Sequence, residues 1–149
     1  MLPTEITVLE RQTALVERFN AMPDWEARYK AVIDMGKALP EFPDDKRLDD
    51  NKVQGCQSQV WLVAALDLNA QGQKIVQFKA DSDALLVKGL LAVVLSVFND
   101  LPPAEILAAN TDFLNEIGLT EHLSMQRNNG LAAVLKQIKF YALAYSAMA

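Results

Sequence analysis

Hydrophobic residues recur every three to four positions over residues 6–39 and 84–145, and at every second position over residues 60–68. The first spacing is typical of amphipathic helices and the second of strands. The chain is therefore predicted to run helix, helix, small antiparallel sheet and then helices again, which is the order of an α+β fold. Because no internal repeat or linker interrupts this order, a single domain over residues 1–149 is expected.

Two helices are predicted before residue 40. The first is expected to begin at Thr4 as N-cap, with Glu5 in its first turn, and the second at Asp24, which follows Pro23. The second helix should end near Leu39, because a following proline disfavours helical backbone. The apolar positions expected to face the core are Ile6, Val8, Leu9, Leu15, Val16 and Phe19 in the first helix and Trp25, Tyr29, Val32, Ile33 and Gly36 in the second.

The middle of the chain predicts a loop followed by a sheet. Residues 40–50 carry two prolines and several acidic side chains among few apolar ones, which is typical of an exposed loop. Alternation predicts a strand over 60–68 and its return over 75–78, joined by turn residues at 69–72. A short strand at 52–54 is expected to precede them, which makes a three-stranded antiparallel sheet packed by the N-terminal and C-terminal helices.

The second half of the chain is predicted to be helical. Ser82 or Asp83 is the expected cap of an apolar helix over 84–98, and the prolines within 101–103 should stop it. A long last helix is expected to begin after Ser124. The residues predicted to form its core face are Leu131, Val134, Leu135, Ile138, Ala142 and Tyr145.

Composition and charge narrow the class of protein. The chain has 51% hydrophobic and 22% charged residues, an ordinary globular balance. Its formal net charge of −5 argues against a broad nucleic-acid surface. The N-terminus lacks a signal-peptide pattern, and the apolar stretch over 84–98 is shorter than the ~20 residues that cross a bilayer. A cytoplasmic protein with no membrane partner is expected.

Cys56 is the only cysteine, and it lies in a polar connection between two predicted strands. Its neighbours Gly55, Gln57 and Ser58 contrast with the apolar surroundings of an inert structural cysteine. A single thiol allows no internal disulfide and no metal site built from several thiolates. An inert thiol and a functional one both remain possible on this pattern, because free cysteines are usually buried.

Two residues of the last predicted helix fit it poorly. Arg127 falls in the first turn, where a cation meets the positive end of the helix dipole. Gly130 lies inside the helix at a cost of about 1 kcal/mol relative to alanine, which is tolerable if another group passes close by. The alternative is a solvated arginine and a harmless glycine. The only histidine, His122, is more consistent with a surface or partly packed side chain than with the base of a cysteine hydrolase.

Four ordered blocks of the chain resemble the SufE family of sulfur-acceptor proteins. The signature block is Gly55-Cys56-Gln57-Ser58-Gln59-Val60-Trp61. The others are Trp25-Glu26 with Tyr29 and Gly36 through Leu39-Pro40, then Asp81-Ser82-Asp83 with Val87-Lys88-Gly89-Leu90, and finally Arg127 with Gly130-Leu131. One departure is visible, since Asn128-Asn129 stands where the family usually has Ser-Gln. The resemblance covers nearly the whole chain from Trp25 onward.

This resemblance implies sulfur relay for iron–sulfur cluster assembly on a SufE/IscU-like fold. A pyridoxal-phosphate cysteine desulfurase of the SufS type would pass sulfur to Cys56 as a covalent persulfide and would be stimulated by it. Cys56 would hand that sulfur to a SufBCD-like scaffold. The protein would then be a carrier with a catalytic cysteine and no bound cofactor or metal, because the pyridoxal phosphate belongs to the desulfurase. A homodimer is possible.

The resemblance also implies roles around the cysteine. Gly55, Gln57, Ser58 and Gln59 would shape the loop and bind the partner. Asp81 and Arg127 would lie near the loop. Arg127 would contribute either a hydrogen bond that fixes the loop or a positive charge that favours the Cys56 thiolate and lowers the pKa of the thiol. Asp81 has an equal alternative as a helix cap.

Three other functions fit the sequence less well than this one. An acceptor for a paralogous desulfurase, of the CsdE type, is the nearest, although the sequence 57–59 favours the partner of the Suf system. A single-cysteine redox sensor is the alternative from another class. A cluster scaffold is disfavoured, because one cysteine and one histidine cannot supply the ligands that a cluster needs.

Overall fold

The computed structural model describes the backbone of residues 4–56 and 58–148 and the side chains of residues 7–56 and 58–148. The side chains of the predicted cap Thr4, of the first-turn Glu5 and of Ile6 thus lie outside the described part, as does Gln57. The helices are α1 (Thr4–Asn20), α2 (Trp25–Lys37), α3 (Leu85–Phe98), α4 (Pro103–Ala108), α5 (Phe113–Glu116), α6 (Leu119–His122) and α7 (Met125–Met148). The strands are β1 (Val60–Leu68) and β2 (Lys74–Ser82), preceded by short 3₁₀ turns η1 (Asp44–Lys46) and η2 (Asp49–Asn51).

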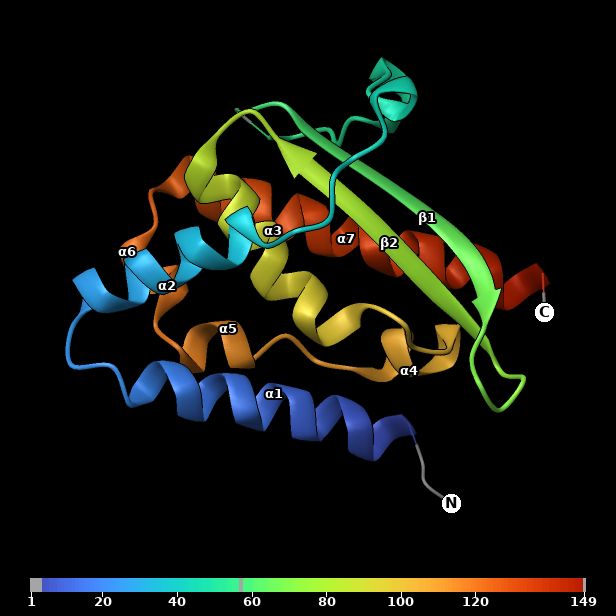
Figure 1. The fold of residues 1–149 in the computed structure, drawn as a ribbon, viewed down its shortest axis with the longest axis horizontal. Coiled ribbons are helices and arrows are strands. Elements are labelled where there is room, and N and C mark those ends of the chain that lie inside the picture. The colour runs from blue at the N-terminus through green and yellow to red at the C-terminus, as the bar shows by residue number, and fades with distance from the viewer. Residues whose placement is uncertain (1–3, 57, 149) are drawn as a thin grey trace.

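The predicted order of helices and strands is confirmed, and the elements form one α+β unit (Figure 1). The Asp24 side chain caps α2 by accepting a hydrogen bond of 2.9 Å from the Ala27 N–H. Ser124 caps α7 in the same way, with its hydroxyl 3.2 Å from the Arg127 backbone nitrogen. Both caps lie at the predicted positions because their oxygens replace the intrahelical acceptors that the first N–H groups lack.

The sheet has two antiparallel strands among the described residues, paired from Val60 opposite Ser82 to Leu68 opposite Lys74. The prediction of three strands is wrong. Residues 52–54 pair with β1 only through the bridge of Lys52 to Trp61 and one hydrogen bond of 2.8 Å from the Val53 N–H. The chain cannot continue the pairing, because η2 ends immediately before this point and Gly55 turns it away with φ +91°.

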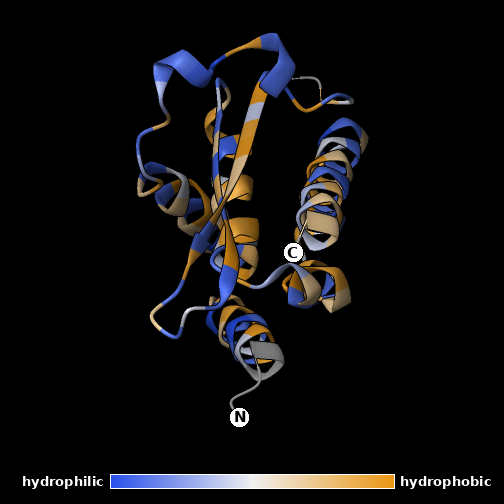
Figure 2. Cartoon of the chain, turned by 90° about the vertical axis from the view of Figure 1, so that its right-hand side faces the viewer, coloured by the Kyte–Doolittle hydropathy of each residue, from blue (hydrophilic) through white to orange (hydrophobic). Residues whose placement is uncertain are grey.

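Helix α3 forms the centre of the molecule. Ten of its residues are buried, and in Figure 2 it is the most consistently apolar helix, between α2 and α7. It approaches α2 so closely that a Cβ added at Gly89 would lie 2.4 Å from the Val32 carbonyl oxygen, and one added at Gly36 would lie 2.7 Å from the Gly89 nitrogen. Only glycine at both positions permits this backbone contact.

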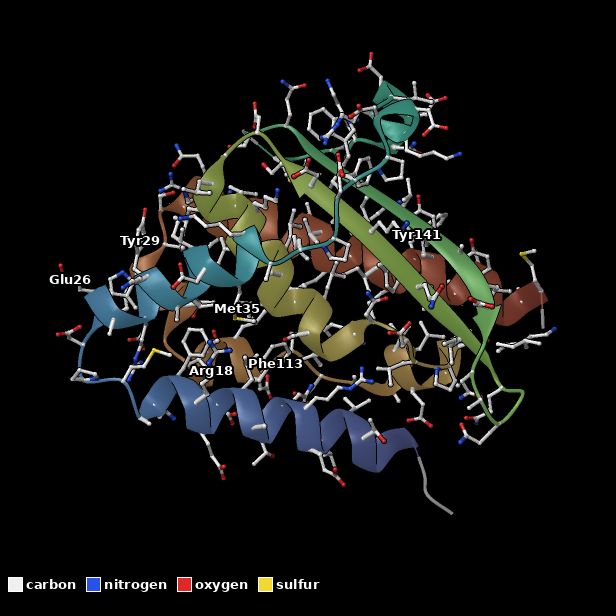
Figure 3. The ribbon with its side chains drawn as sticks, in the orientation of Figure 1. Arg18, Glu26, Tyr29, Met35, Phe113 and Tyr141 are labelled. Atoms are coloured by element: carbon white, nitrogen blue, oxygen red, sulfur yellow. The ribbon has the colours of Figure 1, made fainter. Side chains whose placement is uncertain are left out.

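Helix α7 is fastened to the rest of the fold at two places. Lys139 donates to the carbonyl oxygens of Ile106, Leu107 and Ala109 at the end of α4, and burial lowers the pKa of this lysine. The Tyr145 hydroxyl donates to the Ala64 carbonyl oxygen of β1 over 2.9 Å. Tyr141, labelled in Figure 3, lies on the same helix. Its ring centroid is 6.3 Å from that of Phe78. These contacts give α7 a fixed position, which matters because α7 forms one wall of the site described below.

None of the helices in the described ranges 4–56 and 58–148 combines the length and the apolar character needed to cross a membrane.

Candidate functional site

The loop that carries Cys56 is fastened at both ends. The Val53 N–H bonds to the Val60 carbonyl oxygen over 2.8 Å, which closes the loop at its base. Asp83 holds the outgoing end, since its carboxylate accepts from the Gln59 backbone N–H at 3.0 Å and from the Gln59 side chain at 3.4 Å. The Asp83 N–H also donates to the Gln59 carbonyl oxygen at 3.3 Å. The loop is therefore a closed excursion from β1, at the end of the molecule where α3 and α7 begin (Figure 1).

The tip of the loop rests against α7. The half-buried Cys56 thiol donates to the Gly130 carbonyl oxygen, with Sγ 3.6 Å from that oxygen. A Cβ added at Gly130 would lie 3.5 Å from Sγ, and one added at Gly55 would lie 3.5 Å from the Ala133 Cβ. The expectation that another group passes close to Gly130 is thus correct, and the group is the cysteine itself.

A cavity of about 180 Å³ lies beside the thiol, between α3 and α7. The apolar residues that line it come from these two helices, and the polar ones come from the cysteine loop and from the cap and first turn of α7. The lining residues are Cys56, Ser58, Val87, Leu90, Leu91, Ser124, Gln126, Arg127, Gly130, Leu131 and Val134.

Burial raises the pKa of the Cys56 thiol, because the thiolate loses hydration beside apolar side chains. The pKa of the thiol thus moves in the direction opposite to the one expected from the charge of Arg127. Arg127 does line the same cavity, but its side chain is exposed and water screens its charge. At neutral pH the resting site accordingly holds a protonated, sheltered thiol.

Of the two predicted residues outside the cysteine loop, Asp81 and Arg127, only Arg127 lines the cysteine cavity. Its guanidinium group makes no hydrogen bond or ion pair with any residue in the ranges 4–56 and 58–148. The predicted loop-fixing role is thus not seen, and that role belongs to Asp83.

Asp81 is buried and does not line the cavity. It forms ion pairs with Arg47 at 2.5 Å and with Lys88 at 3.4 Å. Burial raises the pKa of Asp81, but the hydrogen bonds from Arg47 and from the Ser82 N–H, with the charge of Lys88, lower it overall. Because Arg47 lies 5.3 Å from the ring centre of Trp61, the ion pair fastens the segment before the cysteine loop onto the sheet.

Neither predicted cap of α3 has that role. Strand β2 runs through Ser82, and the N-cap of α3 is Ala84, which has no side-chain cap. The Ser82 hydroxyl accepts from the Ala84 N–H at 3.2 Å, whereas Asp83 turns towards Gln59. The helix-cap alternative for Asp81 is therefore also wrong. The Asp81-Ser82-Asp83 block did signal this region, but spacing alone did not show which carboxylate faces the loop.

The other predicted residues of the cysteine loop have different positions. Ser58 lines the cavity, Gln59 joins the loop to Asp83, and Gln57 lies outside the described residues. His122 is not part of the cavity lining, and its ring stacks on Trp25 at 4.2 Å, as expected of a partly packed histidine.

In the described part of the chain no three His, Cys, Asp or Glu side chains are grouped so that they could hold a metal ion. Ser124 and Gln126 could not be identified as cavity residues from the sequence pattern, because only the fold brings the start of α7 to the loop.

Fold and site together define a single-domain α+β protein that holds one sheltered thiol on a fastened loop. The family model described as "SufE: Fe-S metabolism associated domain" matches residues 13–142. The chain belongs to the SufE family, which is associated with iron–sulfur metabolism.

Relatives and a solved structure agree with this assignment. An uncharacterized SufE-like protein of Rhizobium etli is 44% identical over 126 residues, covering 84% of each chain. A second uncharacterized SufE-like protein, of Rhizobium meliloti, is 44% identical over 84% of this chain and 89% of its own length. The solution structure of a hypothetical protein from Thermus thermophilus aligns over 97% of both chains with a TM-score of 0.71 at 20% identity. This last similarity shows the fold alone.

Proposed function

We propose that this protein accepts sulfur on Cys56 from the persulfide of a pyridoxal-phosphate cysteine desulfurase and delivers it to an iron–sulfur cluster scaffold. The observation that carries the proposal is the lone thiol of Cys56, held half-buried at the tip of a fastened loop beside a cavity. A carrier needs this combination, because its sulfur must be reachable by partners and protected between them. Membership of the SufE family supports the link to iron–sulfur metabolism.

The transfer is a thiol exchange that needs no external oxidant. The Cys56 thiolate attacks the outer sulfur of the donor persulfide, the sulfur–sulfur bond of the donor breaks, and the donor cysteine leaves as its thiolate. The proton of Cys56 passes to a base or to solvent. Delivery repeats the step with Cys56 as the leaving thiolate. Since Cys56 is the only cysteine, no second thiol of the chain can displace the sulfur by forming an internal disulfide.

The resting geometry indicates that partner binding moves the loop. In the cavity the thiol bonds to the Gly130 carbonyl oxygen, and burial raises its pKa, so nucleophilic attack from this position is disfavoured. Moving the tip into a wetter or electropositive partner site removes the cause of that shift and restores the thiolate. The bonds of Val53 to Val60 and of Gln59 to Asp83 limit the movement to the tip.

Intact mass spectrometry after incubation with a desulfurase, pyridoxal phosphate and cysteine tests the proposal. The wild type should gain the mass of one sulfur and stimulate turnover, whereas Cys56→Ser should do neither. Stimulation by Cys56→Ser equal to that by the wild type would refute relay through this thiol. Parallel assays with a SufS-type desulfurase and with the paralogous desulfurase that is the partner of CsdE identify the sulfur donor. We expect the SufS-type enzyme to be the donor and the reaction to take place in the cytoplasm. A thiol that gains oxygen from peroxide but never sulfur would favour a redox sensor.

A further inference from the structure

The cavity beside Cys56 is much larger than a bound persulfide requires. One extra sulfur atom needs about the space of one water molecule, ~30 Å³ in the liquid. The cavity measures about 180 Å³ and so has room for a molecule of about six non-hydrogen atoms. Shelter for the sulfur therefore does not account for most of the volume.

The lining of the cavity is divided into an apolar floor and a polar rim. Helix α3 contributes Val87, Leu90 and Leu91 to the floor, and all three are apolar side chains of the central helix. The rim is formed by the cap and the first turn of α7, where the lining residues Ser124 and Arg127 are exposed. A molecule with a short apolar or sulfur-bearing end and a polar end matches this division.

The charge of the cavity lining determines which polar group the bound molecule should carry. Arg127 is the only ionised side chain among the described lining residues, and none of these is Asp, Glu, Lys or His. Its guanidinium group has no partner in the described part of the chain and remains available for a bidentate bond to a carboxylate. An ammonium group would meet no matching charge there. The cavity thus favours small anions over small cations.

We infer that the cavity is a binding site for a small anionic thiol, a mercapto-acid of about six non-hydrogen atoms, which takes the outer sulfur from Cys56. The carboxylate binds Arg127 at the rim and the thiol lies inward beside Sγ. This inference rests on the proposed function, because it gives the Cys56 persulfide a low-molecular-weight acceptor besides a protein scaffold.

The transfer step balances without a further reagent. The thiolate of the mercapto-acid attacks the outer sulfur of the Cys56 persulfide, and the bond between that sulfur and Sγ breaks. Cys56 leaves as a thiolate and takes a proton from solvent when it returns to its bond with the Gly130 carbonyl oxygen. The product is the persulfide of the mercapto-acid, with no net oxidation or reduction.

The anion preference can be measured without any persulfide. Iodoacetate and iodoacetamide differ mainly by a carboxylate. The measured quantity is the alkylation rate of Cys56 by iodoacetate divided by its rate with iodoacetamide. Dividing this ratio by the same ratio in the urea-unfolded protein gives a normalised ratio that reports the charge of the cavity. We expect this normalised ratio to exceed one by about two- to fivefold, the strength of an exposed ion pair. Arg127→Gln should return it to one, while Arg127→Lys should retain part of it. Lys136→Gln removes a cation from the exposed side of α7, outside the cavity lining, and should leave the ratio unchanged.

Sulfur transfer is then measured on protein persulfidated with inorganic polysulfide. Loss of one sulfur should saturate with 3-mercaptopropionate and not with 2-mercaptoethanol, and Arg127→Gln should abolish the saturation. A normalised alkylation ratio of one in the wild type, or one that survives Arg127→Gln, overturns the inference even if a desulfurase loads Cys56. A raised ratio and saturable transfer in a protein that no desulfurase loads would instead support the site and refute the proposed function.

Discussion

Replacing Gly130 by alanine should stabilise the fold, because the structure leaves just enough room for one methyl group. Gly130 is the sixth residue of α7, inside the helix, where alanine is favoured over glycine by about 1 kcal/mol. The added Cβ would lie 3.5 Å from the Cys56 sulfur and 3.8 Å from its Cα and Cβ, which are ordinary contact distances. No steric cost therefore offsets the gain.

We expect Gly130→Ala to raise the free energy of unfolding by about 1 kcal/mol and the melting temperature by roughly 2–4 °C. Urea unfolding monitored by circular dichroism measures the first quantity and calorimetry the second. Because the gain comes from helix propensity, it should also appear in a Cys56→Ala background, with the two values agreeing within about 0.5 kcal/mol.

A fall in stability on Gly130→Ala would refute this reasoning, since it would mean that the methyl group displaces the loop. A gain present only with Cys56 intact would refute it in another way. It would show that the methyl group acts through its contact with the cysteine and not through the helix.

Gly89→Ala should have the opposite sign and lower stability by about 1–3 kcal/mol, because its Cβ would lie 2.4 Å from the Val32 carbonyl oxygen; a neutral result by urea unfolding would contradict the close α2–α3 contact. Asp83→Ala should release Gln59 and speed iodoacetamide labelling of Cys56 severalfold at a stability cost of about 1 kcal/mol, and unchanged labelling would show that the clamp does not restrain the tip. The alkylation rate of Cys56 against pH should rise at higher pH in the folded protein than in urea, because burial raises the pKa of the thiol. An alkylation midpoint in the folded protein at or below the midpoint in urea would contradict the buried thiol. The contribution of this thiol to the free energy of unfolding is constant below the thiol pKa of the unfolded chain, and it declines as pH rises from that pKa to the pKa of the folded protein.

The element order, the caps at Asp24 and Ser124 and the polar connection that carries Cys56 could all be read from the chain, because each depends on residues within a few positions of one another. Gly130 could be flagged for the same reason, as a local misfit in a helix. Its neighbour could not be named, since Cys56 is 74 positions away in the sequence.

The errors share a physical cause. Whether residues 52–54 form a third strand depends on where η2 ends and Gly55 turns, and whether Asp81 or Asp83 faces the loop depends on how far β2 extends. The direction of the Cys56 pKa was decided by desolvation against α3 and α7, which outweighs a screened arginine at the rim. Periodicity and capping are properties of neighbouring residues and are visible in one dimension. Burial, and the choice between two nearby carboxylates, depend on what packs against them, which only the tertiary structure decided.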